Sequence, residues 1–422
     1  MRRSFGTLIL KFCLLVLFLL GVAHILYMYL KDGIQDRASL DFIKNFYISG
    51  EVWVSGLSAY DLDAVRALRQ DFIEHSMLYP PNWFFPTIAF TLFGPTLASD
   101  LWFVGSVVAL FVSCLIILKI FFLPAVPKNR LGEYLEFFSE RGTRLIPLTL
   151  GLFGFIALGK SFGMNVYLGN TGIIAYLGVC VLTFGMIRES RLLAVLGLVI
   201  LMLKPQIGVT FAVVLLLDRF GRGVVIRAAI ASILMAAPAF FFDDPAKIVS
   251  DYLLNMSVHG ELAEGANLPY RMTGIRNLVW RLSGTGMPTL VLLLASVGFA
   301  VLLSVIMRRS FQNEVQKMLL TMAVCACAVT IFVPLHDYDF LILMPVVLSL
   351  GIVTGLPWVI ALIASLGFTR LGEIAEHLFG SANAMSQMEI SSLIVTLSAL
   401  AVFFVLCWAL LGSGALSRGT KV

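Results

Sequence analysis

Long apolar stretches separated by short polar segments make up most of the sequence, and this pattern predicts a series of membrane-spanning helices. A stretch of about 20 apolar residues is enough to cross a bilayer. The first stretch, from about Leu8 to Leu30, follows the basic residues Arg2 and Arg3 and has no small-residue cleavage site after it. It is too long for a signal peptide, so we predict a spanning helix at 7–30 with its N-terminus inside.

The same pattern predicts further helices and a fold that is all-α. Their approximate bounds are 99–123, 145–158, 169–187, 192–203, 207–217, 224–242, 288–307, 315–333, 340–354, 357–369 and 390–412. Basic residues mark inner turns between several of them, and Arg418 and Lys421 place the C-terminus inside as well. We therefore expect one transmembrane domain over 1–422, with about ten to twelve spans and both termini in the cytoplasm.

Two larger polar segments are expected to form loops on the outer face. The first, 31–82, is rich in acidic residues, and its apolar residues recur with helical spacing at 40–54, as in an amphipathic helix at the membrane interface. The apolar segment 82–94 is short enough to be re-entrant. A turn is expected at Lys160–Asn165, and the second outer loop covers 243–286.

Composition supports the membrane assignment and excludes other classes. Hydrophobic residues make up 59% of the chain and charged residues only 13%, against about 25% in soluble domains. So few charges cannot cover a water-facing surface, and the mean hydropathy of +0.94 agrees. The net charge of +5 comes without a basic tract or nucleic-acid motif, so no nucleic-acid partner is expected. The six cysteines lie in apolar runs without a CxxC pair, and we interpret them as small apolar helix residues.

The segment 192–217 contains a lysine between two apolar halves. Basic residues bracket both of its ends, which predicts that both ends are cytoplasmic. Because Pro205 cannot continue a regular helix, we predict a pair of short helices with Lys204 near the turn between them. A lysine in that position either meets a phosphate or extends its ammonium group to the membrane interface.

The first outer loop carries two candidate sites. Asp41 lies just outside the first helix, where a carboxylate is suited to take a proton from an acceptor hydroxyl as a general base. A solvated loop acid is the plainer interpretation. Tyr79–Pro80–Pro81 gives a rigid turn that is equally typical of a helix entry. Tyr60, after Gly56, is open to the same two interpretations.

A further candidate is the polar stretch Pro334–Asp339 between two apolar spans. His336 beside a carboxylate is suited to bind phosphate or move protons, although an ordinary turn between helices explains it as well. Zinc-protease motifs and dinucleotide fingerprints do not occur in the sequence. We expect the chain to take an activated donor from the membrane.

The order of these features resembles glycosyltransferase family 87, within the GT-C superfamily. The pattern of that family is an early Asp and a Gly-x-x-x-Tyr turn, then Tyr-Pro-Pro, a Gly-Gln turn, a Leu-Lys-Pro break and a late His-Tyr motif. The matching residues are Asp41, Gly56 to Tyr60, Tyr79–Pro80–Pro81, Gly169–Asn170, Leu203–Lys204–Pro205 and His336–Asp337–Tyr338. Asn170 replaces the expected Gln, and Asp337 separates His336 from Tyr338. The resemblance spans about 41–340 and implies a GT-C-like fold.

The resemblance also implies a reaction and a set of site residues. Such enzymes transfer a sugar, often mannose, from a polyprenyl-phosphate donor to a lipid or glycan acceptor on the outer face, usually with inversion. Asp41 is then the catalytic base, and Lys204 and His336 lie near the donor phosphate. Arg271 and Arg276, in the second outer loop, either meet the phosphate too or lie on the surface. The residues implied to contact substrate are Tyr60, Tyr79, Asn170 and Tyr338.

The resemblance places the protein in a bacterial inner membrane, with the site facing the exterior and with membrane lipids around it. No metal ion or other cofactor is expected. Two other functions stay open at this stage. A secondary transporter or flippase of lipid-linked substrates predicts broken helices at the membrane midplane and an inverted repeat. A scaffold subunit of an envelope-assembly complex predicts that Asp41, Lys204 and His336 lie apart.

Overall fold

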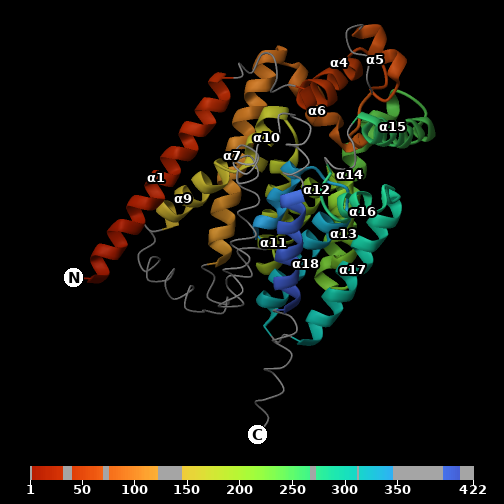
Figure 1. The fold of residues 1–422 in the computed structure, drawn as a ribbon. Coiled ribbons are helices and arrows are strands. Elements are labelled where there is room, and N and C mark those ends of the chain that lie inside the picture. Colours follow the sequence, from red (N-terminus) through yellow and green to blue (C-terminus); the bar gives the residue numbers. More distant parts are fainter. Residues whose placement is uncertain are drawn as a thin grey trace.

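The computed structural model describes residues 2–31, 40–69, 76–121, 145–266, 272–310, 313–345 and 393–408, which are almost entirely helical (Figure 1). The longer helices are α1 (Arg2–Lys31), α7 (Pro95–Phe121), α9 (Leu145–Ala157), α10 (Lys160–Leu168), α11 (Gly172–Ile187), α12 (Arg191–Met202), α13 (Pro205–Leu215), α14 (Arg219–Ala236), α15 (Pro245–Ala266), α16 (Ile275–Ser283), α17 (Thr289–Ser310), α18 (Glu314–Phe332) and Leu393–Trp408. The shorter ones are α3 (Leu40–Phe42), η1 (Ile43–Tyr47), α4 (Ile48–Val54), α5 (Leu62–Leu68), η2 (Pro81–Trp83), α6 (Phe84–Thr91), η3 (Ala237–Phe241) and η5 (Asp337–Leu343).

The protein is an all-α polytopic membrane protein. Five helical segments among the described residues are long and apolar enough to cross a membrane, and they include α1, α7, α14, α17 and α18. α9 and α10 together form a sixth such segment, bent by 70°. Shorter apolar helices are α11, α12, α13 and the helix at 393–408. The expected total of about ten to twelve spans stays a prediction. The predicted helix 357–369 and most of 340–354 lie outside the described residues.

Close packing of α1 against α9 depends on small residues at the contact. A methyl group placed on Gly21 would lie 2.6 Å from the Cα of Gly154, and one placed on Gly154 would lie 2.2 Å from the carbonyl oxygen of Leu17. The two backbones therefore touch, as membrane helices do where small residues face each other. His24 adds a hydrogen bond between its Nδ1 and the carbonyl oxygen of Ala157, 2.8 Å long.

The helices α11, α12, α13 and α18 form the centre of the bundle. α11 and α12 are antiparallel neighbours, because Gly185 packs against Ala194 and Gly197 packs against Leu182. α18 is buried along most of its length. Thr210 of α13 and Ser296 of α17 share a hydrogen bond of 3.1 Å inside this apolar core.

One end of the bundle, called the basic end below, carries the positively charged turns. Arg308 at the end of α17 donates a hydrogen bond of 2.7 Å to the carbonyl oxygen of Leu217, which follows α13. The ends of α7 and α11 pack against the start of α18 in a small apolar cluster that contains Ile120 and Leu319. The basic residues of these turns are Arg188, Arg191, Arg219, Arg222, Arg308 and Lys317.

The opposite end is covered by the helices α4, α5, α6 and α15, which lie together far from the start of α1 (Figure 1). The segment 40–54 is helical, as predicted, and buries an aromatic cluster against α6 and α7. Phe46 is central to this cluster, with ring centroids 4.5 Å from Trp83 and 5.4 Å from Trp102. α15 packs on the turn before α5, where Asn255 donates a hydrogen bond of 3.1 Å to the carbonyl oxygen of Tyr60.

The sequence prediction was wrong at Lys160–Asn165, which is not a turn but most of helix α10. The chain bends at Gly159 instead. Polar residues of α10 made the segment resemble a loop, but Ser161 and Asn165 are one helical turn apart and both buried. The side-chain NH₂ of Asn165 donates to the carbonyl oxygens of Ser161, at 2.8 Å, and of Tyr338, at 2.7 Å. These polar groups therefore tie α10 to η5.

The short apolar segment 82–94 forms η2 and α6 rather than a full span. That this segment is re-entrant stays a prediction. The second polar segment, 243–286, contains the helices α15 and α16.

Candidate functional site

Asp41 and Asn170 meet at the end of the bundle opposite the basic end. Gly169 ends α10 with a φ of 67°, a left-handed conformation that suits glycine and turns the chain toward α11. This turn buries Asn170, whose side-chain NH₂ donates a hydrogen bond of 2.9 Å to Oδ2 of Asp41. Asp41 itself is partly exposed in α3. The contact joins residues from two parts of the chain that the sequence pattern treated separately.

Lys204 lies at the break between α12 and α13, as predicted. Pro205 occupies the first turn of α13, where its missing N–H costs nothing, and it disfavours a helical conformation at Lys204, which has φ −127° and ψ 79°. The Tyr-Pro-Pro segment supports this break from the side. Trp83 donates a hydrogen bond of 2.8 Å from Nε1 to the carbonyl oxygen of Leu203, and Asn82 donates one of 3.3 Å to that of Met202. The break is therefore a rigid support for the lysine.

The ammonium group of Lys204 forms a buried ion pair with Asp339. Its Nζ lies 2.5 Å from Oδ1 of Asp339, and the two residues are only 7% and 2% exposed. The same Nζ lies 3.5 Å from Oδ1 of Asn170 and 5.5 Å from the ring centroid of Tyr338. A continuous chain of polar contacts thus runs from Asp41 through Asn170 and Lys204 to Asp339.

Tyr79 lies next to this chain of polar contacts, and Tyr60 forms a hydrogen bond to the backbone of Tyr79. The hydroxyl of Tyr79 is 3.4 Å from Oγ1 of Thr171. Burial raises the pKa of Tyr79, and the negative charges of Asp41 and Asp339 raise that pKa further, so the hydroxyl stays neutral. Tyr60 is 1% exposed and donates a hydrogen bond of 2.7 Å to the carbonyl oxygen of Tyr79. Burial also raises the pKa of Tyr60.

His336 and Tyr338 belong to the same corner of the molecule. Their rings stack with centroids 5.0 Å apart and an angle of 27° between the planes. The backbone before them is fixed by a bridge in which the N–H of Thr273 donates to the carbonyl oxygen of Leu335 at 3.0 Å. The Tyr338 ring is therefore close to both His336 and Lys204. Arg271 lies outside the described residues, and Arg276 is buried beside Thr289.

Comparison with known proteins gives one match. A family model for glycosyltransferase family 87 covers residues 77–335, which is more than half of the chain. The chain belongs to glycosyltransferase family 87. No curated protein and no solved structure matches it. The resemblance seen in the sequence is thereby confirmed, and the protein is a membrane glycosyltransferase.

The family 87 match contains only part of the polar chain. Tyr79, Asn170 and Lys204 lie within it, whereas Asp41 precedes it and Asp339 follows it. The structure joins these parts by the contacts described above. Of the residues that the sequence implied for the site, it brings together Asp41, Tyr79, Asn170, Lys204 and Tyr338, with His336 beside Tyr338.

Two members of this family 87 site were not among the residues selected from the sequence. Asp339 belongs to the polar stretch around His336 but was not chosen, and Thr171 follows Asn170 without any motif of its own. A buried lysine needs a carboxylate partner, and that requirement was the available signal for Asp339. No comparable signal existed for Thr171, whose backbone N–H donates a hydrogen bond of 2.7 Å to Oδ1 of Asn170.

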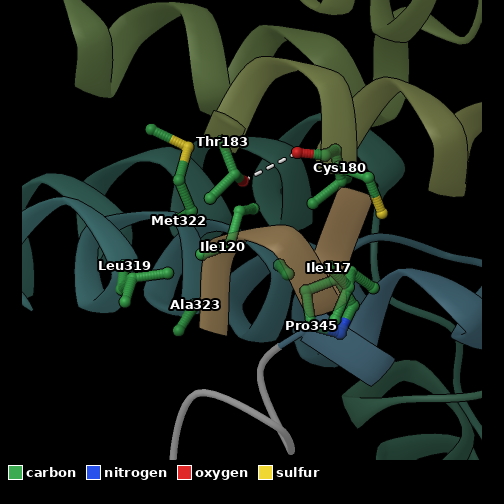
Figure 2. A pocket seen from close by; sticks show the side chains of 10 residues that line it. Ile117, Ile120, Cys180, Thr183, Leu319, Met322, Ala323 and Pro345 are labelled. Carbon is green, nitrogen blue, oxygen red and sulfur yellow. Dashed lines mark hydrogen bonds between the residues drawn. The ribbon is translucent and has the colours of Figure 1, made fainter. Parts of the chain in front are cut away.

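Elsewhere, a small cavity of about 20 Å³ lies among α7, α11 and α18 (Figure 2). It is lined mostly by apolar side chains such as Ile117, Leu319 and Met322. The hydroxyl of Thr183 already donates to the carbonyl oxygen of Val179 at 2.7 Å. A cavity of this size holds about one water molecule and offers no group for catalysis. In the part of the chain that the structure describes, His, Cys, Asp and Glu side chains form no cluster suited to a metal ion.

Proposed function

We propose that the protein transfers a hexose, mannose or a related sugar, from a polyprenyl-phosphate donor to a lipid or glycan acceptor on the outer face of the membrane. The observation that carries this proposal is the partly exposed carboxylate of Asp41, oriented by Asn170, at the end of a buried polar chain in a family 87 protein. Family membership gives only the class of reaction. The proposal adds the donor, the acceptor and the base.

In the proposed reaction, Asp41 takes the proton of an acceptor hydroxyl. The hydroxyl oxygen then forms a bond to the anomeric carbon of the sugar, while the bond from that carbon to the phosphate oxygen breaks. The phosphate leaves with the electron pair of the broken bond. One base and a single displacement invert the anomeric centre, as in inverting glycoside hydrolysis. Asn170 leaves one oxygen of Asp41 available, because its NH₂ donates to the other.

The leaving phosphate needs positive charge around it. Lys204 alone is insufficient, because its ammonium group is already matched by Asp339. Asp41, Asp339 and Lys204 together carry a net charge of about −1 when all three are ionised. We therefore assign Arg271 and His336 to the donor phosphate together with Lys204. Tyr79 and Tyr338 are assigned to the sugar, with Tyr60 supporting Tyr79.

The distribution of charge supports an outer-face site. Cytoplasmic turns of membrane proteins carry an excess of Lys and Arg. The basic end has this composition, and α1 begins with Arg2 and Arg3. Because the polar chain lies at the opposite end, the positive-inside rule supports a site on the exterior with both termini cytoplasmic, and the membrane we propose is a bacterial inner membrane.

The test is transfer of radiolabelled mannose from polyprenyl-phosphomannose into an added lipid extract by purified protein in lipid nanodiscs. Wild type should form labelled lipid, and Asp41→Ala should form none above background. Asp63→Ala is the matched control, because Asp63 is an acid of the same outer segment whose side chain is 95% exposed. It should behave as wild type.

Normal turnover by Asp41→Ala would remove Asp41 from the role of base. If wild type transfers no mannose, other polyprenyl-phosphate hexoses are offered under the same conditions. A wild type that uses none of them, in protein whose thermal unfolding is cooperative, would refute the proposed donor class.

A further inference from the structure

The buried ion pair between Lys204 and Asp339 lies next to Asn170 and bears on the orientation of the Asn170 side chain. Lys204 reaches Oδ1 of Asn170 at 3.5 Å while it pairs with Asp339 at 2.5 Å. Both partners of the ion pair are almost fully buried. A buried charge that loses its partner is strongly destabilised, so each member constrains where the other lies. Asp339 thus fixes the position of the ammonium group.

The ammonium group in turn fixes which way the amide of Asn170 points. The oxygen of this amide accepts from the N–H of Thr171 at 2.7 Å and faces Lys204, while its NH₂ donates to Asp41. The reversed amide would place its NH₂ against two donors and its oxygen against a carboxylate. Lys204 and Thr171 therefore select the orientation in which Asn170 donates to Asp41.

We propose that Asp339 is a positioning residue, which acts through Lys204 and Asn170 on the orientation of Asp41. The proposal rests on the proposed function, in which Asp41 is the base. Asp339 does not itself act as a base, because its carboxylate is buried and engaged by Lys204. Without Asp339, Lys204 would turn to the carboxylate of Asp41 and occupy the oxygen that receives the proton.

The position of Asp339 is itself well defined by the backbone. Its N–H donates a hydrogen bond of 3.0 Å to the carbonyl oxygen of His336, at the start of η5. The carbonyl oxygen of the preceding residue, Tyr338, accepts from Asn165 of α10 at 2.7 Å. Because α10 leads directly into Gly169 and Asn170, the same helix holds Asn170 and the backbone just before Asp339. Asp339 is therefore held firmly enough by the backbone to position Lys204.

The experiment compares Asp339→Asn, Lys204→Met and the double variant with wild type, at varied donor concentrations and in the nanodisc assay above. Asp243→Asn is the matched control. Asp243 also lies 2.5 Å from a lysine, Lys247, but that pair is far more exposed, with side chains that are 25% and 49% exposed. The double variant leaves no unpaired charge, so it guards against a variant that fails to fold.

We expect Asp339→Asn to lower kcat by about 10²-fold, the loss typical of a displaced catalytic group, and to raise the KM for the donor by no more than Lys204→Met does. The double variant should be no slower than Lys204→Met, because Asp339 acts only through the lysine. An unchanged kcat with a raised KM would overturn the proposal. So would a double variant in which the two single losses multiply.

A second measurement does not depend on turnover. In protein labelled with ¹⁵N-asparagine, the side-chain amide signals of Asn170 are assigned by their loss in Asn170→Asp. These signals should shift in Asp339→Asn and in Lys204→Met but not in Asp243→Asn. Unchanged Asn170 signals in Asp339→Asn would overturn the positioning role. A wild type without transferase activity would instead count against the proposed function alone.

Discussion

Replacing Asn170 by Asp tests the proposed base most directly, because the change keeps the shape of the side chain and replaces the NH₂ group by a carboxylate oxygen. In wild type that NH₂ lies 2.9 Å from Oδ2 of Asp41. Two unit charges at this separation repel by about 6 kcal/mol at an effective dielectric constant of about 20. Partial exposure of Asp41 reduces the repulsion to a few kcal/mol.

The size of this repulsion decides the protonation of the pair. Holding a proton on an ordinary carboxyl group at pH 7 requires about 4 kcal/mol, since its usual pKa is about 4. The repulsion is of this order, so the two carboxyl groups of Asn170→Asp share a proton near neutral pH, as in aspartic-protease dyads. The base is then occupied, and transfer should fall by about 10²-fold or more at pH 6.5.

The sign of the pH dependence follows from the same argument. A shared proton is lost as the pH rises, so the activity of Asn170→Asp should recover toward pH 9, relative to wild type at each pH. The assay is the initial rate of mannose transfer between pH 5.5 and 9, with Asn170→Ala as a control that removes the hydrogen bond without adding charge. A pH profile of Asn170→Asp that superimposes on that of Asn170→Ala would refute the reasoning.

Three further outcomes follow from the contacts around the site. Trp83→Phe leaves the buried carbonyl oxygen at the end of α12 without its donor, so the free energy of unfolding should fall by about 1–3 kcal/mol; an unchanged unfolding midpoint in detergent would contradict this. Tyr79→Phe should leave the pH profile of transfer unchanged up to pH 10, because the raised pKa keeps the Tyr79 hydroxyl neutral; a new alkaline limb in wild type alone would contradict it. Gly154→Val forces α1 away from α9 and should lower the unfolding midpoint, whereas Gly105→Val, at a position with open space, should not.

Hydropathy was sufficient to predict the bundle because lipid-facing helices are apolar over their full length. It also located the break at Lys204, since Pro205 and the basic residues at both ends leave few other arrangements. It failed at α10, whose buried polar residues face other helices instead of water. A hydropathy scale cannot distinguish a polar loop from a buried helix whose polar side chains form hydrogen bonds to neighbouring helices.

The candidate site was predictable only in pieces. Asp41 and Lys204 were selected from local patterns and Asn170 from the family resemblance, yet 129 residues separate Asp41 from Asn170 along the chain. Asp339 was missed because its role depends on a contact with Lys204 across 135 residues, which no local pattern records. Which of several acids pairs with a buried lysine is decided by packing.

The shortness of α12 and α13 sets the depth at which Lys204 lies. They are 12 and 11 residues long, so each rises about 18 Å or less from the basic end before the chain turns back. The hydrocarbon layer of a bilayer is about 30 Å thick. The turn at Lys204 therefore lies roughly 10 Å below the far lipid surface if these helices stand upright in a membrane of ordinary thickness. A sugar donor dissolved in water would have to leave its solvent to reach that level, whereas one with a long apolar tail already has its anchor there.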